Sequence, residues 1–231
     1  MMSRQLLHIS YFILYNKNIM GIFFNLNSKF KNTKIIYFDT TINKKTMDIY
    51  EDMVVFRDEN FNVNSVNLLN AKSKKRDEKI FGFLNENETK KLVNKLHKYN
   101  KKYLLKSIKY FRIGKIVERK KHPKSDRLFV LKIDFGNEVK QIITNTTYTL
   151  ENKYFTFCLP GSITANGLEI LDGKIMNVES DGMLCSAESL DLEAKSYKEF
   201  EEGFFNNVLE EEKQKYLGKE IQELLPELIS K

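Results

Sequence analysis

Residues 111–188 form a series of short apolar stretches separated by turn residues, and this pattern restricts the fold more than any other feature of the chain. Several stretches alternate apolar and polar side chains, and glycine, asparagine or proline stands at their junctions. We predict about five strands, at residues 114–117, 131–135, 141–144, 155–159 and 175–178. Short strands with no helix between them are typical of a small all-β barrel or sandwich.

A basic segment, ERKKHPKSDR at 118–127, lies between the first two predicted strands. Pro123 fixes its own φ and disfavours the helical region for His122, so we expect a loop or turn. The positive charges of this loop are on Arg119, Lys120, Lys121, Lys124 and Arg127. A five-stranded barrel with a basic first loop fits the OB-fold, which binds oligonucleotides through one strand face and loops of this kind.

The ordered motifs of this region resemble those of the tRNA-binding OB domain. They read GKIVERKKHPKSDRLFVLKIDFG, QII, LPGS and SDGMLCS. That domain occurs in the beta chain of bacterial phenylalanyl-tRNA synthetase, in methionyl-tRNA synthetase extensions, in stand-alone tRNA-binding proteins and in YtpR-type proteins. The resemblance implies non-catalytic binding of structured RNA, with tRNA as the expected partner, by contacts to phosphates and shape.

We expect ten residues to form the RNA surface. They are Lys115, Arg119, Lys120, Lys121, His122, Lys124, Arg127, Tyr148, Ser180 and Met183. His122 has no partner at catalytic spacing, so a structural or base-stacking role is expected. Ser180 and Met183 enter because the resemblance implies that their segment borders the RNA face, and Gly182 between them is expected to supply a special φ.

Two departures from the family pattern favour an alternative function. Tyr148 stands where the family has asparagine, and it can stack on a base but cannot repeat that hydrogen bonding. Met176 and Asn177 replace an Arg-Gly pair, so a positive charge is absent. The alternative is a protein-interaction module that docks a synthetase or a ribosomal partner. A fragment of the synthetase beta chain is a weaker alternative, because the first 105 residues do not resemble the start of that protein.

The first part of the chain, residues 10–105, predicts a small mixed α+β domain. Strands are expected at 11–15, 19–24, 35–38 and 53–56, with looser alternation around Val63, Val66 and Leu68. Leu92, Val93, Leu96 and Tyr99 lie on one face of a helix over about 87–101, and Asn85 or Asn87 can cap it. The order of these segments resembles the N-terminal domain of YtpR-type proteins. Residues 1–9 are expected to be a leader.

The fold class expected for the whole chain is α+β. The mixed N-terminal domain precedes an all-β OB barrel at 106–220, which carries a helical and strand extension. An amphipathic tail follows at 221–231, in which Ile221, Leu224, Leu225, Leu228 and Ile229 share one helical face and Pro226 interrupts the helix. We expect this face to dock on the barrel, with a homodimer contact as the minority alternative.

The charge distribution points to a polyanionic partner. The net charge is +9 in residues 1–105, +3 in 106–190 and −5 in 191–231. The chain has 32 Lys and only 6 Arg, so a general lysine excess is less informative than its clustering. Residues 106–127 hold nine basic and two acidic side chains, and such a cluster attracts phosphates and releases counterions.

Other classes of protein are disfavoured by the composition. No apolar stretch reaches ~18 residues, so we expect no membrane span. Cys158 and Cys185 do not suggest a disulfide scaffold or a zinc site, and they suit a reducing compartment, so a cytoplasmic location is expected. No phosphate-binding loop, nucleophile motif or carboxylate pair is present. We therefore expect a non-enzyme without a metal or a cofactor.

Overall fold

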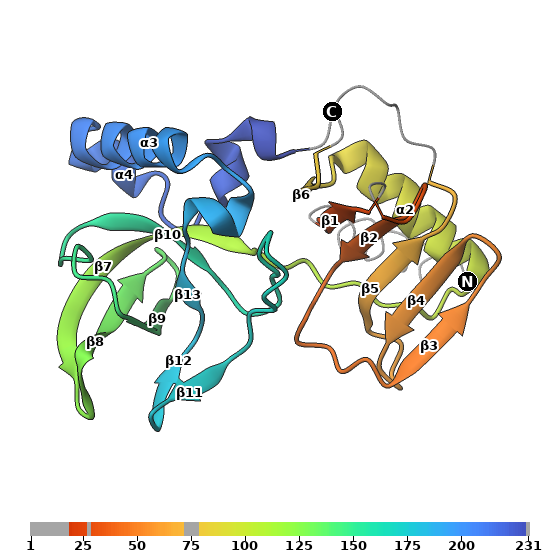
Figure 1. The fold of residues 1–231 in the computed structure, drawn as a ribbon, viewed down its shortest axis with the longest axis horizontal. Coiled ribbons are helices and arrows are strands. Elements are labelled where there is room, and N and C mark those ends of the chain that lie inside the picture. The colour runs from red at the N-terminus through yellow and green to blue at the C-terminus, as the bar shows by residue number, and fades with distance from the viewer. Residues whose placement is uncertain (1–18, 27–28, 72–78, 230–231) are drawn as a thin grey trace, which may run out of the picture. The chain divides into compact units, whose positions relative to one another are not determined.

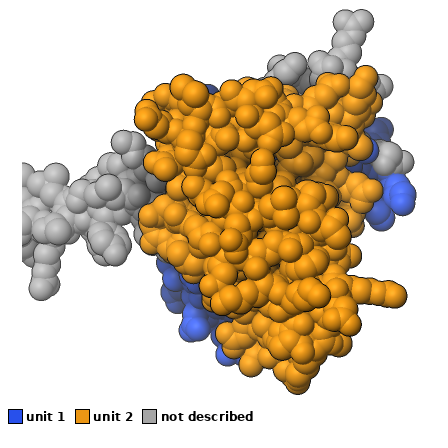
Figure 2. Space-filling model, turned by 90° about the vertical axis from the view of Figure 1, so that its left-hand side faces the viewer, with its two compact units in different colours: residues 1–108, 229–231 blue, residues 109–228 orange. Residues whose placement is uncertain are grey.

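The computed structural model describes residues 19–26, 29–71 and 79–229 (Figure 1). The chain divides into two compact units, which Figure 2 distinguishes by colour. Unit 1 comprises residues 1–108 and 229–231, and unit 2 comprises residues 109–228. The leader expected at 1–9 and the strand expected at 11–15 lie outside the described residues. The described chain is rich in β-structure with few helices.

Unit 1 contains a six-stranded antiparallel sheet in the order β3-β4-β5-β2-β1-β6. The strands are β1 (Ile22–Asn25), β2 (Lys34–Tyr37), β3 (Thr46–Ile49), β4 (Met53–Arg57), β5 (Val63–Leu68) and β6 (Phe81–Phe83). Strands β3 and β6 were not predicted. β6 is only three residues long and buried throughout, and β3 alternates half-buried polar with exposed apolar side chains over only four residues, so both give a short and weak signal.

Helix α2 (Glu86–Tyr99) follows β6 and lies within two residues of its predicted bounds. Asn85 caps it, since its side chain accepts from the Glu88 amide while the Glu88 carboxylate accepts from the Asn85 amide. Leu92, Val93 and Leu96 are buried and pack in one core with apolar side chains of β2, β4 and β5. Burial of this apolar face stabilises the helix more than its intrinsic propensity does.

Unit 2 contains a five-stranded antiparallel sheet in the order β13-β10-β7-β8-β9. Its strands are β7 (Phe111–His122), β8 (Ser125–Asp134), β9 (Val139–Thr144), β10 (Tyr154–Cys158) and β13 (Met183–Leu184). The prediction of a strand at 175–178 is wrong. Met176 and Asn177 are the turn of a separate hairpin, β11 (Gly173–Ile175) and β12 (Val178–Ser180), and both have positive φ. Two central residues with positive φ match the right-handed twist of a tight hairpin.

The segment before β13 is bonded to β9, the strand at the other edge of this sheet. The Asp181 amide donates to the Gln141 carbonyl at 2.7 Å, and the Ile143 amide donates to Ser180 Oγ at 3.0 Å. Gly182 has φ +134°, and a Cβ there would lie 2.4 Å from the Cys158 carbonyl oxygen. The special φ expected at this glycine is therefore confirmed, and it lets the chain turn into β13.

The extension of unit 2 is helical in the described residues. It consists of α3 (Ala194–Asn207), α4 (Glu210–Gln214) and 3-10 turns at Ala187–Leu190, Ile221–Glu223 and Pro226–Leu228. Phe205 of α3 is buried against Tyr154 and Ile113 of the sheet. Ile221 and Leu228 are also buried. Within unit 2, Figure 1 shows α3 and α4 at one end and the β11–β12 hairpin at the other. None of the helices described is long and apolar enough to cross a membrane.

Candidate nucleic-acid interface

The basic segment 118–127 was predicted as a loop or turn, and it is a hairpin of two strands joined by a short turn. Strand β7 continues to His122 and β8 begins at Ser125, so Pro123 and Lys124 alone connect them. Lys121 pairs with Phe129 in the register of this hairpin. The strands were missed because the consecutive residues Lys120 and Lys121 are both charged and exposed, which hides the alternation that marks a strand.

Four cations lie near the tip of this hairpin and are exposed. They are Lys120, Lys121, Lys124 and Arg127, called the tip cations below. Lys120 Nζ lies 2.9 Å from the Glu118 carboxylate, and both side chains are well exposed. The other three make no ion pair with any residue that the structure describes. Since exposed lysine and arginine heads need only shed water and counterions, the tip can bind an external anion at little cost.

Arg119 connects the hairpin to the loop between β9 and β10. Its guanidinium carbon lies 3.5 Å from the centre of the Phe129 ring, and its Nη2 donates to the Thr147 carbonyl at 3.4 Å. Its backbone amide donates to Glu151 Oε1 at 2.8 Å. The Arg119 Nε is buried and has no hydrogen-bond partner among the described residues. Arg119 is therefore held in place with one buried donor, Nε, unsatisfied.

Tyr148 directly follows the carbonyl that Arg119 contacts. The side chain is 59% exposed, and its ring centre lies 5.8 Å from that of Phe155. Burial, and secondarily the charge of Glu201, raise the pKa of the Tyr148 hydroxyl, so it stays protonated at neutral pH. The structure thus brings an arginine and an exposed aromatic ring from distant parts of the sequence to one place on unit 2.

His122 lies in the interior, at the end of β7. Its ring is 4% exposed, Nε2 lies 3.1 Å from the Ile175 carbonyl, and Nδ1 accepts from the Lys124 amide at 3.1 Å. A carbonyl can only accept, so Nε2 carries the proton. Both nitrogens are engaged, and the ring ties the β7–β8 hairpin to β11. Of the two roles expected for His122, structural or base-stacking, this placement fits the structural role.

Three further predicted residues are held by contacts within unit 2. Lys115 Nζ lies 2.7 Å from the Glu210 carboxylate, and the hydrogen bond from Lys115 is the main cause that lowers the pKa of Glu210. Ser180 is buried and its hydroxyl donates to the Gly182 carbonyl at 3.1 Å. Met183 is half-buried on β13 and pairs with Cys158 of β10.

Sequence reasoning missed Phe129 and Thr147, the two residues that position Arg119. The alternation Phe129, Leu131, Ile133 along β8 is a signal that could have marked the Phe129 ring as facing one side of the strand. No sequence signal marks the Thr147 carbonyl. Within the residues that the structure describes, no group of three histidines, cysteines or carboxylates is placed to hold a metal ion.

This segment of the chain also matches a known family of domains. The family model described as "Putative tRNA binding domain" matches residues 111–204. The matched segment is less than half of the chain and includes β7–β13 and most of α3.

Relatives carry the same domain in two settings. The "Phenylalanine--tRNA ligase beta subunit" of Thermotoga maritima is 40% identical over 83 residues, which are 36% of this chain and 10% of that protein. The "Putative tRNA-binding protein YtpR" of Bacillus subtilis is 34% identical over 82 residues, which are 36% of this chain and 41% of that protein. The chain therefore spans less than half the length of either relative. These matches confirm the resemblance to the YtpR and synthetase tRNA-binding domain.

A solved structure, the "Crystal structure of MetRS related protein from Pyrococcus horikoshii", is 26% identical to this chain. The match covers 44% of this chain and 80% of that one, with a TM-score of 0.29. That score is too low to add to the assignment of the fold.

Proposed function

We propose that this protein binds structured RNA, with tRNA as the ligand, and does not transform it. Unit 2 is then an OB-type barrel, and its RNA surface consists of the tip cations, Arg119 and Tyr148. The observation that carries the proposal is the position of three cations without ion pairs among the described residues at the tip of the β7–β8 hairpin, inside the matched tRNA-binding domain.

The chemistry of the surface suits a folded RNA. Lysine heads act as point charges for phosphates and carry no base specificity. Arg119 packs on the Phe129 ring, and in this proposal the guanidinium N–H groups that are not bonded to Thr147 contact a phosphate or a base. Tyr148 offers an exposed ring on which an unstacked base can pack, and such stacking contributes about 1–3 kcal/mol. Recognition by shape and phosphates follows, with strong dependence on salt.

The remaining predicted residues support the surface in this proposal. His122 and Ser180 are buried, so they fix the hairpin and the β9 edge instead of meeting the RNA. Lys115 would have to leave Glu210 before it could reach a phosphate. We therefore assign Lys115, His122, Ser180 and Met183 to the support of the RNA surface.

The test is a titration of the full chain with unfractionated tRNA at several salt concentrations. The variant Lys120→Glu/Lys121→Glu/Lys124→Glu should bind at least about tenfold more weakly than the wild type, with a smaller salt slope. The control Lys195→Glu/Lys198→Glu/Lys215→Glu makes the same change in net charge at exposed lysines of α3 and of the residue after α4, and should bind nearly as the wild type does. Unchanged binding by the hairpin variant, or equal affinity for random duplex DNA, would refute the proposal.

A second candidate function is docking to an aminoacyl-tRNA synthetase or a ribosomal partner. The segment that leads into the β11–β12 turn has four exposed apolar side chains, Leu168, Leu171, Ile175 and Met176. Pull-down from cells with and without ribonuclease separates the two functions. Partners that persist after digestion favour docking, and partners that are lost favour RNA binding.

A further inference from the structure

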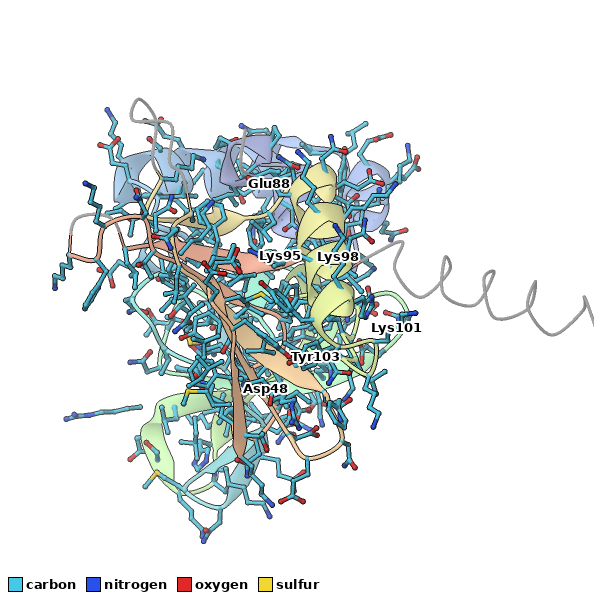
Figure 3. The ribbon with its side chains drawn as sticks, turned by 90° about the vertical axis from the view of Figure 1, so that its right-hand side faces the viewer. Asp48, Glu88, Lys95, Lys98, Lys101 and Tyr103 are labelled. Carbon is cyan, nitrogen blue, oxygen red and sulfur yellow. The ribbon has the colours of Figure 1, made fainter. Side chains whose placement is uncertain are left out.

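Unit 1 has a basic surface of its own. Residues 89–106, which include most of α2, contain seven lysines and no acidic residue. Lys90, Lys91, Lys98, Lys101, Lys102 and Lys106 are exposed. Figure 3 labels Lys95 and Lys98 along the helix and Lys101 just beyond its end. Elsewhere in the chain lysines commonly stand near acids, so this uniform stretch is a distinct feature of the charge distribution.

The lysines of α2 share the face opposite the core. Lys91, Lys95 and Lys98 are separated by four and three residues, which places them on one side of a helix. Leu92 and Leu96 point into the core of unit 1. With a rise of about 1.5 Å per residue, Lys91 and Lys98 lie roughly 10 Å apart along the axis. Because a single small anion cannot span that distance, the row suits an extended polyanion.

One lysine of the row is neutralised and the others are not. Lys95 Nζ lies 2.5 Å from the Asp52 carboxylate, which also accepts from the Tyr99 hydroxyl at 2.9 Å. Within the described ranges, Lys91, Lys98 and Lys101 make no ion pair. The contacts of Asp52 fix the helix against the turn before β4. They position the row of lysines and neutralise only the charge of Lys95.

An aromatic ring accompanies the charges. Tyr99 is 42% exposed, and its ring stacks on that of Tyr50 with the centres 4.0 Å apart and an angle of 22° between the planes. Lysines beside an aromatic ring that is held in position, here by Tyr50, are typical of surfaces that bind single-stranded or looped nucleic acid.

The segment after α2 is held as firmly as the helix. Tyr103 is buried, its hydroxyl donates to Asp48 Oδ2 at 2.7 Å, and its carbonyl lies 3.0 Å from His97 Nε2. Lys102 Nζ lies 5.3 Å from the centre of the Phe61 ring. Lys101 and Lys102 therefore follow α2 on a fixed backbone, and Figure 3 labels Lys101 and Tyr103 beyond the end of the helix.

We propose that this lysine face, composed of Lys91, Lys98, Lys101, Lys102 and Tyr99, is a second RNA-contacting surface. The inference rests on the proposed function for the identity of the ligand, but not on the residues of unit 2. The lysines contact phosphates of the bound RNA, and Tyr99 packs on a base or ribose beside them. The protein is then a two-surface RNA binder, and its affinity combines both sets of contacts.

The experiment measures tRNA binding by the full chain over a range of salt concentrations. The variant Lys91→Glu/Lys98→Glu/Lys101→Glu leaves the Lys95–Asp52 pair intact. The control Lys29→Glu/Lys31→Glu/Lys45→Glu makes the same change in net charge at other exposed lysines of unit 1. We expect the α2 variant to weaken binding about tenfold or more and to reduce the salt slope by about one for each lost phosphate contact. The control should change both quantities much less.

The outcomes separate this inference from the proposed function. Equal effects of the α2 variant and its control would overturn the second surface, while loss of binding in the β7–β8 hairpin variant would leave the proposed function standing. A hairpin variant that binds like the wild type would overturn the proposed site, and a selective loss in the α2 variant would still support the second surface. Absence of tRNA binding by the wild type would overturn both. The Lys→Gln form of the α2 variant repeats the test if the Glu form fails to fold, as judged by circular dichroism.

Discussion

Arg112 is a buried cation of β7 that joins three segments of unit 2. Its side chain is 6% exposed. Its guanidinium forms an ion pair with Glu138 and donates to Asn137 Oδ1 at 2.8 Å and to the Gly218 carbonyl at 3.1 Å. It also lies 4.7 Å from the centre of the Phe135 ring. One side chain thereby joins β7, the β8–β9 turn and the chain that follows α4.

The substitution Arg112→Met keeps the buried methylene packing and removes every one of these polar contacts. Breaking a buried ion pair costs about 3–5 kcal/mol of unfolding free energy, because the remaining partner is left as a buried charge without an opposite charge beside it. Glu138 is 39% exposed and can recover water, whereas the Gly218 carbonyl is left without this donor. We therefore expect Arg112→Met to lower the unfolding free energy by about 3 kcal/mol, the lower end of that range.

Urea unfolding followed by circular dichroism measures this loss, because the chain has no tryptophan to report by fluorescence. Two units allow two transitions, and only the transition of unit 2 should move. The control Lys140→Met removes the other cation beside Glu138, at 3.3 Å and partly exposed, and should cost less than about 1 kcal/mol. A loss below about 1 kcal/mol for Arg112→Met would refute the role given to this contact network.

Three other predictions concern single positions. Gly182→Ala should destabilise unit 2 by about 2–4 kcal/mol in urea unfolding, because its Cβ would clash with the Cys158 carbonyl, whereas Gly173→Ala, with open space around it, should be nearly neutral. Burial raises the pKa of Glu201 to about 7, so stability should fall as the pH rises from about 4.5 to 7. Glu201→Gln should reduce that slope and raise the unfolding free energy at pH 8 by about 1–2 kcal/mol, and an unchanged pH profile would contradict this. Asn85→Ala removes the cap of α2 and should lower the melting temperature of unit 1 by a few degrees, for a loss of about 1 kcal/mol; an unshifted melt would contradict the cap.

Local patterns were sufficient to predict much of the fold. The helix at α2 follows from a capping asparagine and apolar residues at helical spacing, and the strands around Val55, Val66 and Ile133 follow from their alternation. The family of the second half follows from ordered motifs over a long stretch. These features depend on neighbours in the sequence, so a single sequence carries them.

The errors lie where distant contacts decide the structure. The β7–β8 hairpin extends past the core, and only its pairing shows that Lys121 belongs to a strand. A helical extension was expected, but the bounds of α3 were not predicted, because its apolar side chains pack on a distant part of the sheet, as Phe205 does. The closeness of Arg119 and Tyr148 depends on the pairing of β7 with β10 and on the path of the loop before it. No spacing in the sequence predicts that contact.

Photo-crosslinking of the full chain to tRNA tests the central claim most directly. Bound complexes are irradiated, the RNA is digested, and the modified peptides are identified by mass spectrometry. We predict crosslinks at residues 119–127 and at Tyr148, which compete with unlabelled tRNA and not with random duplex DNA. Crosslinks confined to the acidic helices α3 and α4, or the same yield with duplex DNA, would contradict an RNA surface on the β7–β8 hairpin.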